Sequence, residues 1–356
     1  TKLFVVAAMQ TLEQTGLCGS CHCGALTYIA TSIPTSTGYC HCTKCQRLTG
    51  GPFVPTVHFP LESVAFCATP DSALHTYTPA SHPHETRYRC NICGVGVGSV
   101  NKKEGHTAVW GGTLTRIPVA GEESAGRIAM WEKISPVLHY HYGERMLDIR
   151  DGLRKYRDRV PEDVGAPGSC SVQGGDADET SDAASEDASD EAAGEQLSGG
   201  CFCGQISYTF SATDVLRTAY CHCTQCQKLT GCPFIHTIHL RSSAVAFALP
   251  SSAATVHTSS STIPASQIEL VSLPHVLRAY NTPLKPHKTR LRCATCGTCV
   301  ASMNSLTGTT SVWGVHLARS PSGRICEWDK VRLVRPYVQS IARDTSIDGN
   351  IIQSSR

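Results

Sequence analysis

The chain has 356 residues, 20 cysteines and a formal net charge of +2. This length allows two domains of ordinary size, each with its own hydrophobic core. Cysteine makes up roughly 6% of the residues, less than in short disulfide scaffolds, and no segment reaches the ~20 apolar residues of a membrane span. Composition therefore favours a soluble protein of a reducing compartment, and we expect a cytoplasmic location.

The charge is distributed unevenly along the chain. Residues 162–196 contain 11 acidic side chains and no lysine or arginine, whereas residues 1–161 carry a formal charge of +4 and residues 197–356 one of +9. The acidic segment has almost no large apolar side chains, so we predict a disordered linker between domains 1–161 and 197–356. Cysteines that bind metal do so as negatively charged thiolates, which lowers the net charge of both domains. After this correction only the second domain keeps a clear excess of positive charge, which favours anionic partners.

An internal repeat begins after residue 16. A C-x-C-G motif at residues 21–24 leads into an alternating segment that ends at Tyr28, and it returns at residues 201–204 before a segment that ends at Tyr208. Each copy predicts a turn followed by a short strand. Further strands are expected at residues 53–59 and 234–240, and Pro55 in the first of these favours an edge or bulged strand.

A three-cysteine motif lies between these strands. Residues 39–50 read Y-C-H-C-T-K-C-Q-R-L-T-G, and residues 220–231 read Y-C-H-C-T-Q-C-Q-K-L-T-G. Three cysteines spaced C-x-C-x-x-C can surround one ion but cannot complete a tetrahedron. Zinc sites with three protein ligands leave one position for water or substrate, which is typical of catalytic sites.

The copies then fall out of register. Their offset rises from 180 or 181 residues to 203, which indicates a 22-residue insertion near residues 251–275 that we expect to be a mobile surface loop. The register resumes at an R-x-R-C-x-x-C-G motif at residues 87–94 and 290–297, typical of a zinc-knuckle turn. The first copy ends in residues 139–156, which have no counterpart in the diverged C-terminal end of the second. Short strands with Gly and Pro between them predict two small all-β domains, each held by metal.

Seven cysteines recur in the same order in both copies and six have no counterpart. Two distant pairs and one local triplet suggest a closed four-thiolate site and an open three-thiolate site in each domain. The alternative is one ordinary zinc site per domain, with the other cysteines buried as small apolar residues. The expected closed sites are Cys21, Cys23, Cys90 and Cys93, and Cys201, Cys203, Cys293 and Cys296; the open sites are Cys40, Cys42 and Cys45, and Cys221, Cys223 and Cys226.

These motifs resemble the glutathione-dependent formaldehyde-activating (GFA) domain, which is grouped with centromere-protein-V-like proteins. The likeness covers most of residues 17–160 and 198–335, in two tandem copies. It implies a β-tent fold, a structural zinc on the cysteine pairs and a catalytic zinc on the triplet, hence two zinc ions per domain and four per chain. It also implies carbon–sulfur lyase chemistry, in which glutathione is a co-substrate. The missing closing segment and the insertion make the first domain the expected carrier of activity.

Hemithioacetal chemistry also needs a proton donor or acceptor that works near neutral pH. The candidates are His41 and His222 inside the triplets and His58 and His239 on the following strands. We favour the interpretation that His41 and His222 only orient ligands, because both neighbours of each are cysteines of the triplet. Basic residues that could meet the carboxylates of glutathione are Arg47, Arg87, Lys228 and Arg290.

The predicted function is thus a zinc-dependent carbon–sulfur lyase that acts on glutathione or another thiol adduct of an aldehyde or other electrophile. The competing interpretation is a non-catalytic zinc-binding module that serves as a scaffold, chaperone or chromatin-associated protein. The basic second domain is compatible with that alternative. However, the sequence has no run of five basic residues and no aromatic stacking platform among its basic residues, so we do not expect nucleic acid as a partner.

Overall fold

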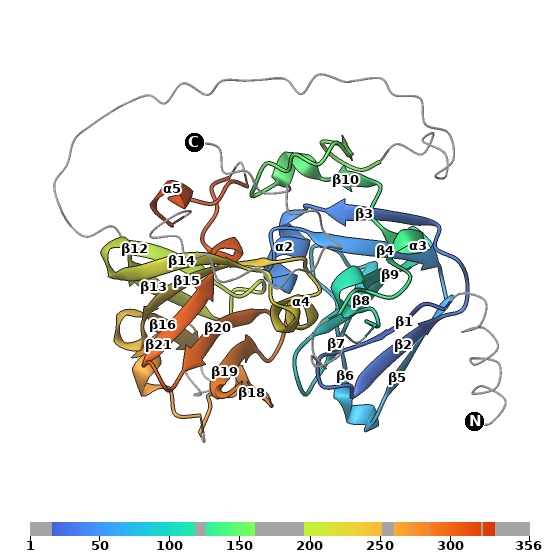
Figure 1. Cartoon of the computed structure of the whole chain (residues 1–356). Helices are drawn as coiled ribbons and strands as arrows, with labels where there is room; N and C mark the ends of the chain where they lie inside the picture. The colour runs from blue at the N-terminus through green and yellow to red at the C-terminus, as the bar shows by residue number, and fades with distance from the viewer. Residues whose placement is uncertain are drawn as a thin grey trace, which may run out of the picture.

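The two copies of the repeat form two halves that lie side by side (Figure 1). This computed structural model describes residues 16–117, 126–160, 196–250, 260–270, 272–283, 285–321 and 323–331, and it is mainly β. We call residues 16–160 the first half and residues 196–331 the second half. The acidic segment predicted to be a linker lies outside the described residues, apart from Gln196 at its end.

The first half contains two sheets. The smaller has the strand order β1-β2-β5, and the larger has the order β11-β10-β3-β4-β9-β8-β7-β6. Neighbouring strands are antiparallel except that β10 is parallel to both β3 and β11. The strands are β1 (Cys18–Ser20), β2 (Leu26–Ala30), β3 (Ser36–Cys40), β4 (Val54–Pro60), β5 (Val64–Ala68), β6 (Leu74–Tyr77), β7 (Glu85–Cys90), β8 (Gly96–Asn101), β9 (His106–Trp110), β10 (Leu138–Tyr140) and β11 (Arg154–Lys155).

The second half repeats this plan with two differences. Its sheets have the orders β12-β13-β16-β17 and β14-β15-β21-β20-β19-β18, so β17 is added to the smaller sheet, and among the described residues nothing corresponds to β10 and β11. The strands are β12 (Gln196–Gly200), β13 (Ser207–Ser211), β14 (Val215–Cys221), β15 (Ile235–Arg241), β16 (Ala246–Pro250), β17 (Ser260–Pro264), β18 (Leu277–Thr282), β19 (Lys285–Cys293), β20 (Cys299–Asn304) and β21 (Thr309–Trp313).

Two details differ from the sequence predictions. Pro55 lies in a central strand, because β4 pairs with both β3 and β9; the ladder to β9 begins only at Thr56, so the missing N–H of Pro55 interrupts no bond on that side. In the described part of the predicted insertion, residues 260–267 are not a loop but form β17 and a 3-10 turn, because Ile263 pairs opposite Phe247 and Ile268 is buried in the core.

Each triplet begins a short helix. Helices α2 (Thr43–Thr49) and α4 (Thr224–Thr230) start directly after the second cysteine of the triplet and end at a glycine in the left-handed conformation, Gly50 (φ 92°) or Gly231 (φ 76°). Glycine adopts this conformation without the steric cost that a Cβ would add. The remaining α-helices of the described residues are the single turns α3 (Trp131–Ile134) and α5 (Trp328–Val331).

The halves pack through equivalent surfaces, as in an isologous dimer. The backbone N–H of Gly112 donates to the carbonyl of Gly231 (3.2 Å), and a Cβ on Gly231 would lie 2.8 Å from the Trp110 side chain. Phe53 and Phe234 meet edge to face with ring centroids 5.5 Å apart. The turns after the two triplet helices therefore face each other across the contact.

Candidate metal centres

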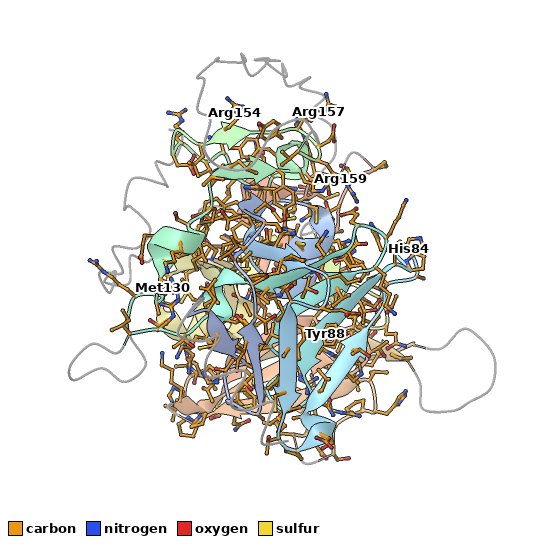
Figure 2. All side chains as sticks on the ribbon, turned by 90° about the vertical axis from the view of Figure 1, so that its right-hand side faces the viewer. His84, Tyr88, Met130, Arg154, Arg157 and Arg159 are labelled. Atoms are coloured by element: carbon orange, nitrogen blue, oxygen red, sulfur yellow. The ribbon has the colours of Figure 1, made fainter. Side chains whose placement is uncertain are left out.

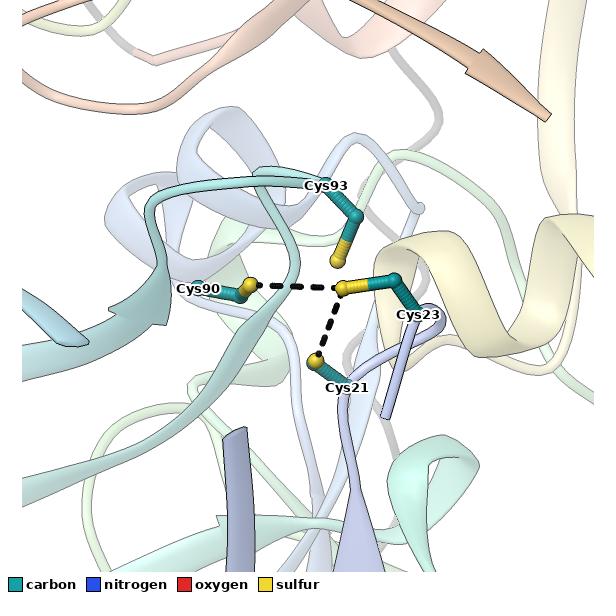
Figure 3. A group of neighbouring side chains, drawn as sticks. All are labelled: Cys21, Cys23, Cys90 and Cys93. Atoms are coloured by element: carbon teal, nitrogen blue, oxygen red, sulfur yellow. Dashed lines mark hydrogen bonds between the residues drawn. The ribbon is translucent and has the colours of Figure 1, made fainter. Parts of the chain in front are cut away.

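Four cysteines of the first half converge on one point (Figure 3). Cys21 and Cys23 lie in the turn between β1 and β2, while Cys90 ends β7 and Cys93 lies in the turn before β8. Their four sulfur atoms lie within 4.8 Å of one another, and Cys201, Cys203, Cys293 and Cys296 form the same arrangement in the second half. Each cluster joins the smaller sheet of its half to the larger one.

The sulfur spacing fits a tetrahedral zinc ion. Cys23 Sγ lies 3.6 Å from the sulfur atoms of both Cys21 and Cys90, and Cys203 has two equivalent distances of 3.6 Å in the second half. A disulfide requires about 2.05 Å, whereas Zn–S bonds of about 2.3 Å at tetrahedral angles place the sulfurs about 3.8 Å apart. These clusters therefore suit a metal ion much better than disulfides.

Backbone amides point at the sulfur atoms of these clusters. The N–H of Leu26 donates to Cys21 Sγ (3.3 Å) and that of Ile92 to Cys90 Sγ (3.4 Å), while Ile206 donates to Cys201 Sγ (3.3 Å). Hydrogen bonds to sulfur stabilise the thiolate over the thiol, and the thiolate is the form that binds metal. The second-half cluster therefore has the same design as the first.

Within the described residues, the two triplets are the other groups that could hold a metal ion. In the first half, Cys40 Sγ lies 3.4 Å from Cys42 Sγ; in the second half, Cys221 Sγ lies 3.4 Å from the sulfurs of Cys223 and Cys226. Three sulfurs at this spacing occupy three corners of a zinc tetrahedron. Among the described residues no fourth cysteine, histidine or carboxylate completes either group, so each triplet offers an open site.

A buried arginine contacts each triplet. Arg87 Nη2 lies 3.4 Å from Cys45 Sγ, and Arg290 Nη2 lies 3.5 Å from Cys226 Sγ. Each guanidinium also lies over a tryptophan ring, at 4.9 Å from the centroid of Trp110 and 5.2 Å from that of Trp313. The positive charge offsets part of the charge of the thiolates, and the ring fixes the position of the arginine.

The pKa values of the thiols in the first triplet move in different directions. Burial, together with the thiols of Cys42 and Cys45, raises the pKa of Cys40 well above its usual range. Hydrogen bonds from Cys40 and Cys42, with a smaller contribution from Arg87, lower the pKa of Cys45. Without metal, the negative charge therefore concentrates on Cys45, whereas a bound zinc ion would stabilise all three thiolates.

His41 belongs to a buried chain of hydrogen bonds. Its Nε2 lies 2.7 Å from Nδ1 of His139, whose Nε2 lies 2.7 Å from Oδ2 of Asp151. The other carboxylate oxygen of Asp151 accepts from the Leu153 amide (3.1 Å) and from Lys155 Nζ (3.1 Å). The ring of His41 is thus held by the closing segment of the first half, as expected for a residue that orients the loop carrying Cys40 and Cys42.

His58 lies in a second polar network. Its Nε2 lies 3.1 Å from Thr56 Oγ1 and 3.3 Å from the hydroxyl of Tyr140, and these two hydroxyls are 2.8 Å apart. Tyr140, in β10, packs against the cluster that contains Cys40, Cys42 and Cys45. Burial, followed by the charge of His106, lowers the pKa of His58 to about 4, so its imidazole is neutral at pH 7.

In its described residues, the second half has no counterpart of the His41 chain and keeps only part of the His58 network. The His222 ring stacks on Phe234 at a centroid distance of 4.9 Å and makes no side-chain hydrogen bond within the described residues. His239 Nε2 lies 3.1 Å from Thr237 Oγ1, and its Nδ1 lies 2.8 Å from Ser311 Oγ. No tyrosine takes the place of Tyr140 in the described part of this half. As a result Cys221 and Cys223 are half-buried, whereas Cys40 and Cys42 are 3% and 9% exposed.

Two of the four basic candidates lie at the contact between the halves. Arg47 Nη2 donates to the carbonyl of Cys201 (2.9 Å) and its guanidinium lies over the Phe202 ring. Lys228 lies close enough to Arg116 of the first half for the two charges to repel. Only Arg87 and Arg290 lie beside a triplet. His84, the residue directly before β7, is exposed at the surface (Figure 2).

Sequence reasoning noted residues 139–156 as a segment but assigned no role to the residues inside it. His139, Tyr140 and Asp151 are the members that reach the site, whereas Arg154 and Arg157 of the same region project from the surface (Figure 2). No local pattern marks the first three as site residues, because β10 spans only Leu138–Tyr140 and His141 follows it with a left-handed backbone (φ 54°).

The fold and these clusters define a tandem-repeat β protein with two kinds of cysteine cluster in each half that could hold a metal ion. The family model described as glutathione-dependent formaldehyde-activating enzyme matches residues 16–133 and 196–268, more than half of the chain. The chain therefore belongs to the GFA family. A crystal structure of a Rhodobacter sphaeroides protein is 17% identical with a TM-score of 0.24, covering 28% of this chain and 90% of that chain, a likeness too weak to add to the assignment. No curated protein matches the chain, and no helix among the described residues is long and apolar enough to cross a membrane.

Proposed function

We propose that the first half is a zinc-dependent carbon–sulfur lyase-type enzyme that joins a thiol to an aldehyde or other electrophile, or splits such an adduct. Glutathione is the thiol that the family description suggests. The observation that carries the proposal is the buried first triplet with the Tyr140, Thr56 and His58 network beside it. A zinc ion on Cys40, Cys42 and Cys45 would supply a Lewis acid with one open position.

The reaction forms or breaks one carbon–sulfur bond and moves one proton. In the direction of addition, the thiol sulfur bonds to the carbonyl carbon, and the thiol proton ends on the former carbonyl oxygen. Tyr140 is suited to hydrogen-bond to that oxygen, because burial keeps its hydroxyl protonated by raising its pKa well above 10. The neutral His58 orients the Tyr140 hydroxyl together with Thr56.

The other residues hold the site in shape. His41 and His139 fix the triplet loop against Asp151, while Arg87 offsets the thiolate charge and fixes Cys45. We assign Cys21, Cys23, Cys90 and Cys93 and their second-half equivalents to closed structural zinc sites. This gives two zinc ions in each of the domains 1–161 and 197–356. Arg87 and Arg290 are the basic candidates that remain for contact with an anionic co-substrate.

The test is thiol–aldehyde turnover by the zinc-loaded full chain, with glutathione and a panel of aldehydes. Tyr140→Phe removes one hydroxyl from the network, and we expect kcat to fall about 100-fold, in the range typical of a lost hydrogen-bond donor to a developing oxyanion. Thr56→Val and the second-half variant Thr237→Val provide a matched pair, of which only the first should slow turnover. The proposal fails if the wild-type chain turns over no member of the panel, a result that would favour a non-catalytic zinc-binding module.

A further inference from the structure

The two triplets differ in the charges that surround them. In the first half, Lys44 of α2 forms an ion pair with Glu85 of β7, and Glu85 Oε1 also accepts from Arg87 Nη2 (2.7 Å). The repeat places Gln225 and Lys288 at the positions of Lys44 and Glu85. Glu85 is the only carboxylate among Lys44, Glu85 and Arg87. In the second half its position is taken by a cation, Lys288, which stands beside the cation Arg290.

Strand geometry places Lys288 on the side of the triplet. It precedes Arg290 by two residues in β19, so the two side chains share a face of the strand, and Arg290 contacts Cys226 Sγ. In the first half Glu85 precedes Arg87 by two residues in the same way, and these side chains touch. Lys288 is half-buried, and burial followed by the charges of Lys285 and Arg290 lowers its pKa.

Lys285 lies close enough to Cys223 and to Lys288 for its charge to act on both. Within the described residues neither Lys285 nor Lys288 forms an ion pair with a carboxylate, although both are half-buried. The buried amide nitrogen Nε2 of Gln225 also has no hydrogen-bond partner there. The thiolates of Cys226 and Cys221 act on Lys288 as counter-charges. A metal ion bound to the triplet offsets the charge of these thiolates, so an anionic ligand would stabilise the half-buried cations.

The second triplet is also the more accessible one. Because no described strand covers it as β10 covers the first, Cys221 and Cys223 are half-buried. A ligand that carries a charged group beside its sulfur atom can therefore approach this triplet, whereas Tyr140 and Glu85 oppose such a ligand at the first.

We propose that the second triplet is an anion-selective site for a small thiol that carries a carboxylate. The sulfur takes the open metal position on Cys221, Cys223 and Cys226, and the carboxylate pairs with Lys285 and Lys288. The proposal rests on the open metal site of the proposed function. In this proposal Lys288, which occupies the position of Glu85 in the first half, sets the preference of the second triplet for anionic ligands.

The test follows thiol binding to the full chain carrying Cys42→Ser, which removes a ligand of the first triplet. The protein is loaded with Co²⁺, and the thiolate–cobalt absorption bands are followed during titration with 3-mercaptopropionate or with uncharged 2-mercaptoethanol. We expect 3-mercaptopropionate to bind about five- to tenfold more tightly, a difference in the range of one or two ion pairs, and to lose this advantage in high salt. The double variant Cys42→Ser/Cys223→Ser should give no response, which isolates the second triplet from the four-cysteine clusters.

Lys288→Glu, added to the Cys42→Ser chain, should abolish or reverse the preference, and Lys103→Glu, the same change at an exposed site, should not. Because Lys288→Glu buries a new carboxylate, Gln225→Lys/Lys288→Glu serves as a second variant that reproduces the Lys44–Glu85 pair of the first half. Equal binding of the two thiols, or a preference unchanged in the variants, overturns the proposal. Failure of both thiols to bind would instead contradict the open metal site.

Discussion

Arg89 of the first half donates a hydrogen bond from Nη1 to the backbone carbonyl of Cys293 (3.3 Å), a ligand candidate of the second half. Its Nη2 donates to the next two carbonyls, Ala294 (2.6 Å) and Thr295 (2.9 Å). The equivalent residue Arg292 reaches back to the carbonyl of Asn91 in the first half's cysteine turn. Each half therefore supports the turn that carries two cysteines of the other half's closed cluster.

Arg89→Ala should destabilise the second half even though the substitution lies in the first. It removes the three hydrogen bonds to the second half and the two contacts of Arg89 with His75, and it takes one donor from the carbonyl of the buried Cys293, so we expect the free energy of unfolding to fall by about 2–4 kcal/mol. Urea unfolding of the zinc-loaded chain measures the loss, and zinc release identifies the half that opens first. Arg241→Ala, at an exposed arginine, is the control. Equal stability of the two variants would show that the contact contributes nothing.

The same contacts predict that the halves stay together after the chain is cut between them. A specific protease site inserted at Gly174 permits one cleavage in the acidic segment. We expect two zinc-bound fragments that co-elute in size-exclusion chromatography, because Arg319 Nη2 donates to Gln46 Oε1 (2.6 Å) and Arg116 Nη2 to Gln227 Oε1 (2.6 Å) across the contact. Arg116→Ala/Arg319→Ala should weaken this association. Separation of the wild-type fragments at micromolar concentration would contradict the prediction.

The repeat was enough to predict the cysteine groups, because three ligand motifs at fixed spacing occur twice in one chain. The contact between the halves could not be predicted from the sequence. Arg47 looked like a ligand-binding residue beside the first triplet, yet it donates to the carbonyl of Cys201, since α2 turns its side chain toward the other half. Tyr140 was missed as a site residue for a related reason: a parallel strand that returns from nearly 100 residues away leaves no local pattern.

The closed clusters and the triplets should respond differently to the loss of one ligand. Wild-type protein purified without chelator should contain close to four zinc ions per chain, and Cys42→Ser close to three with nearly unchanged unfolding. Cys90→Ser should unfold much of the first half, because the binding energy of structural zinc contributes directly to folding. Elemental analysis and thermal unfolding provide the measurements, and Cys67→Ser, an exposed cysteine without a counterpart, is the control. Similar melting of Cys42→Ser and Cys90→Ser would argue against two classes of site.

Acid should weaken the contact between the halves through His316. Burial, followed by the charge of Arg47, lowers the pKa of His316 from 6.5 to about 3. Between pH 3 and pH 6.5, His316 is protonated in the unfolded chain but not in the folded chain. The contribution of the neutral His316 to stability is therefore complete above pH 6.5 and declines as pH falls toward 3. The first half has Thr113 at this position. Between pH 7 and pH 5, His316→Thr should therefore lose roughly 2 kcal/mol less free energy of unfolding than the wild type, measured in urea with zinc present. His84→Thr, at an exposed histidine, should match the wild-type slope.

The last prediction is that carbon–sulfur turnover depends mainly on the first half, although both triplets are complete. An open metal site performs selective chemistry only where the protein shapes a pocket, excludes water and orients the reactants. The first triplet has these surroundings, because β10 brings Tyr140 against it and His139 fixes His41. In the described part of the second half His239 contacts only Thr237 and Ser311 by hydrogen bonds, and no strand covers the cysteines.

We therefore expect Cys42→Ser to abolish most turnover in the full zinc-loaded chain, and Cys223→Ser to reduce kcat by less than about twofold. Both variants remove the same atom from equivalent positions, so zinc content and unfolding curves should match, and a difference in turnover then reports on the surroundings of each site. Tyr140→Phe should reproduce part of the Cys42→Ser loss without loss of zinc, which separates orientation of the reactants from metal binding. A larger loss from Cys223→Ser would assign the activity to the second triplet, whose surroundings are more cationic, and Lys288 would then be the first residue to examine.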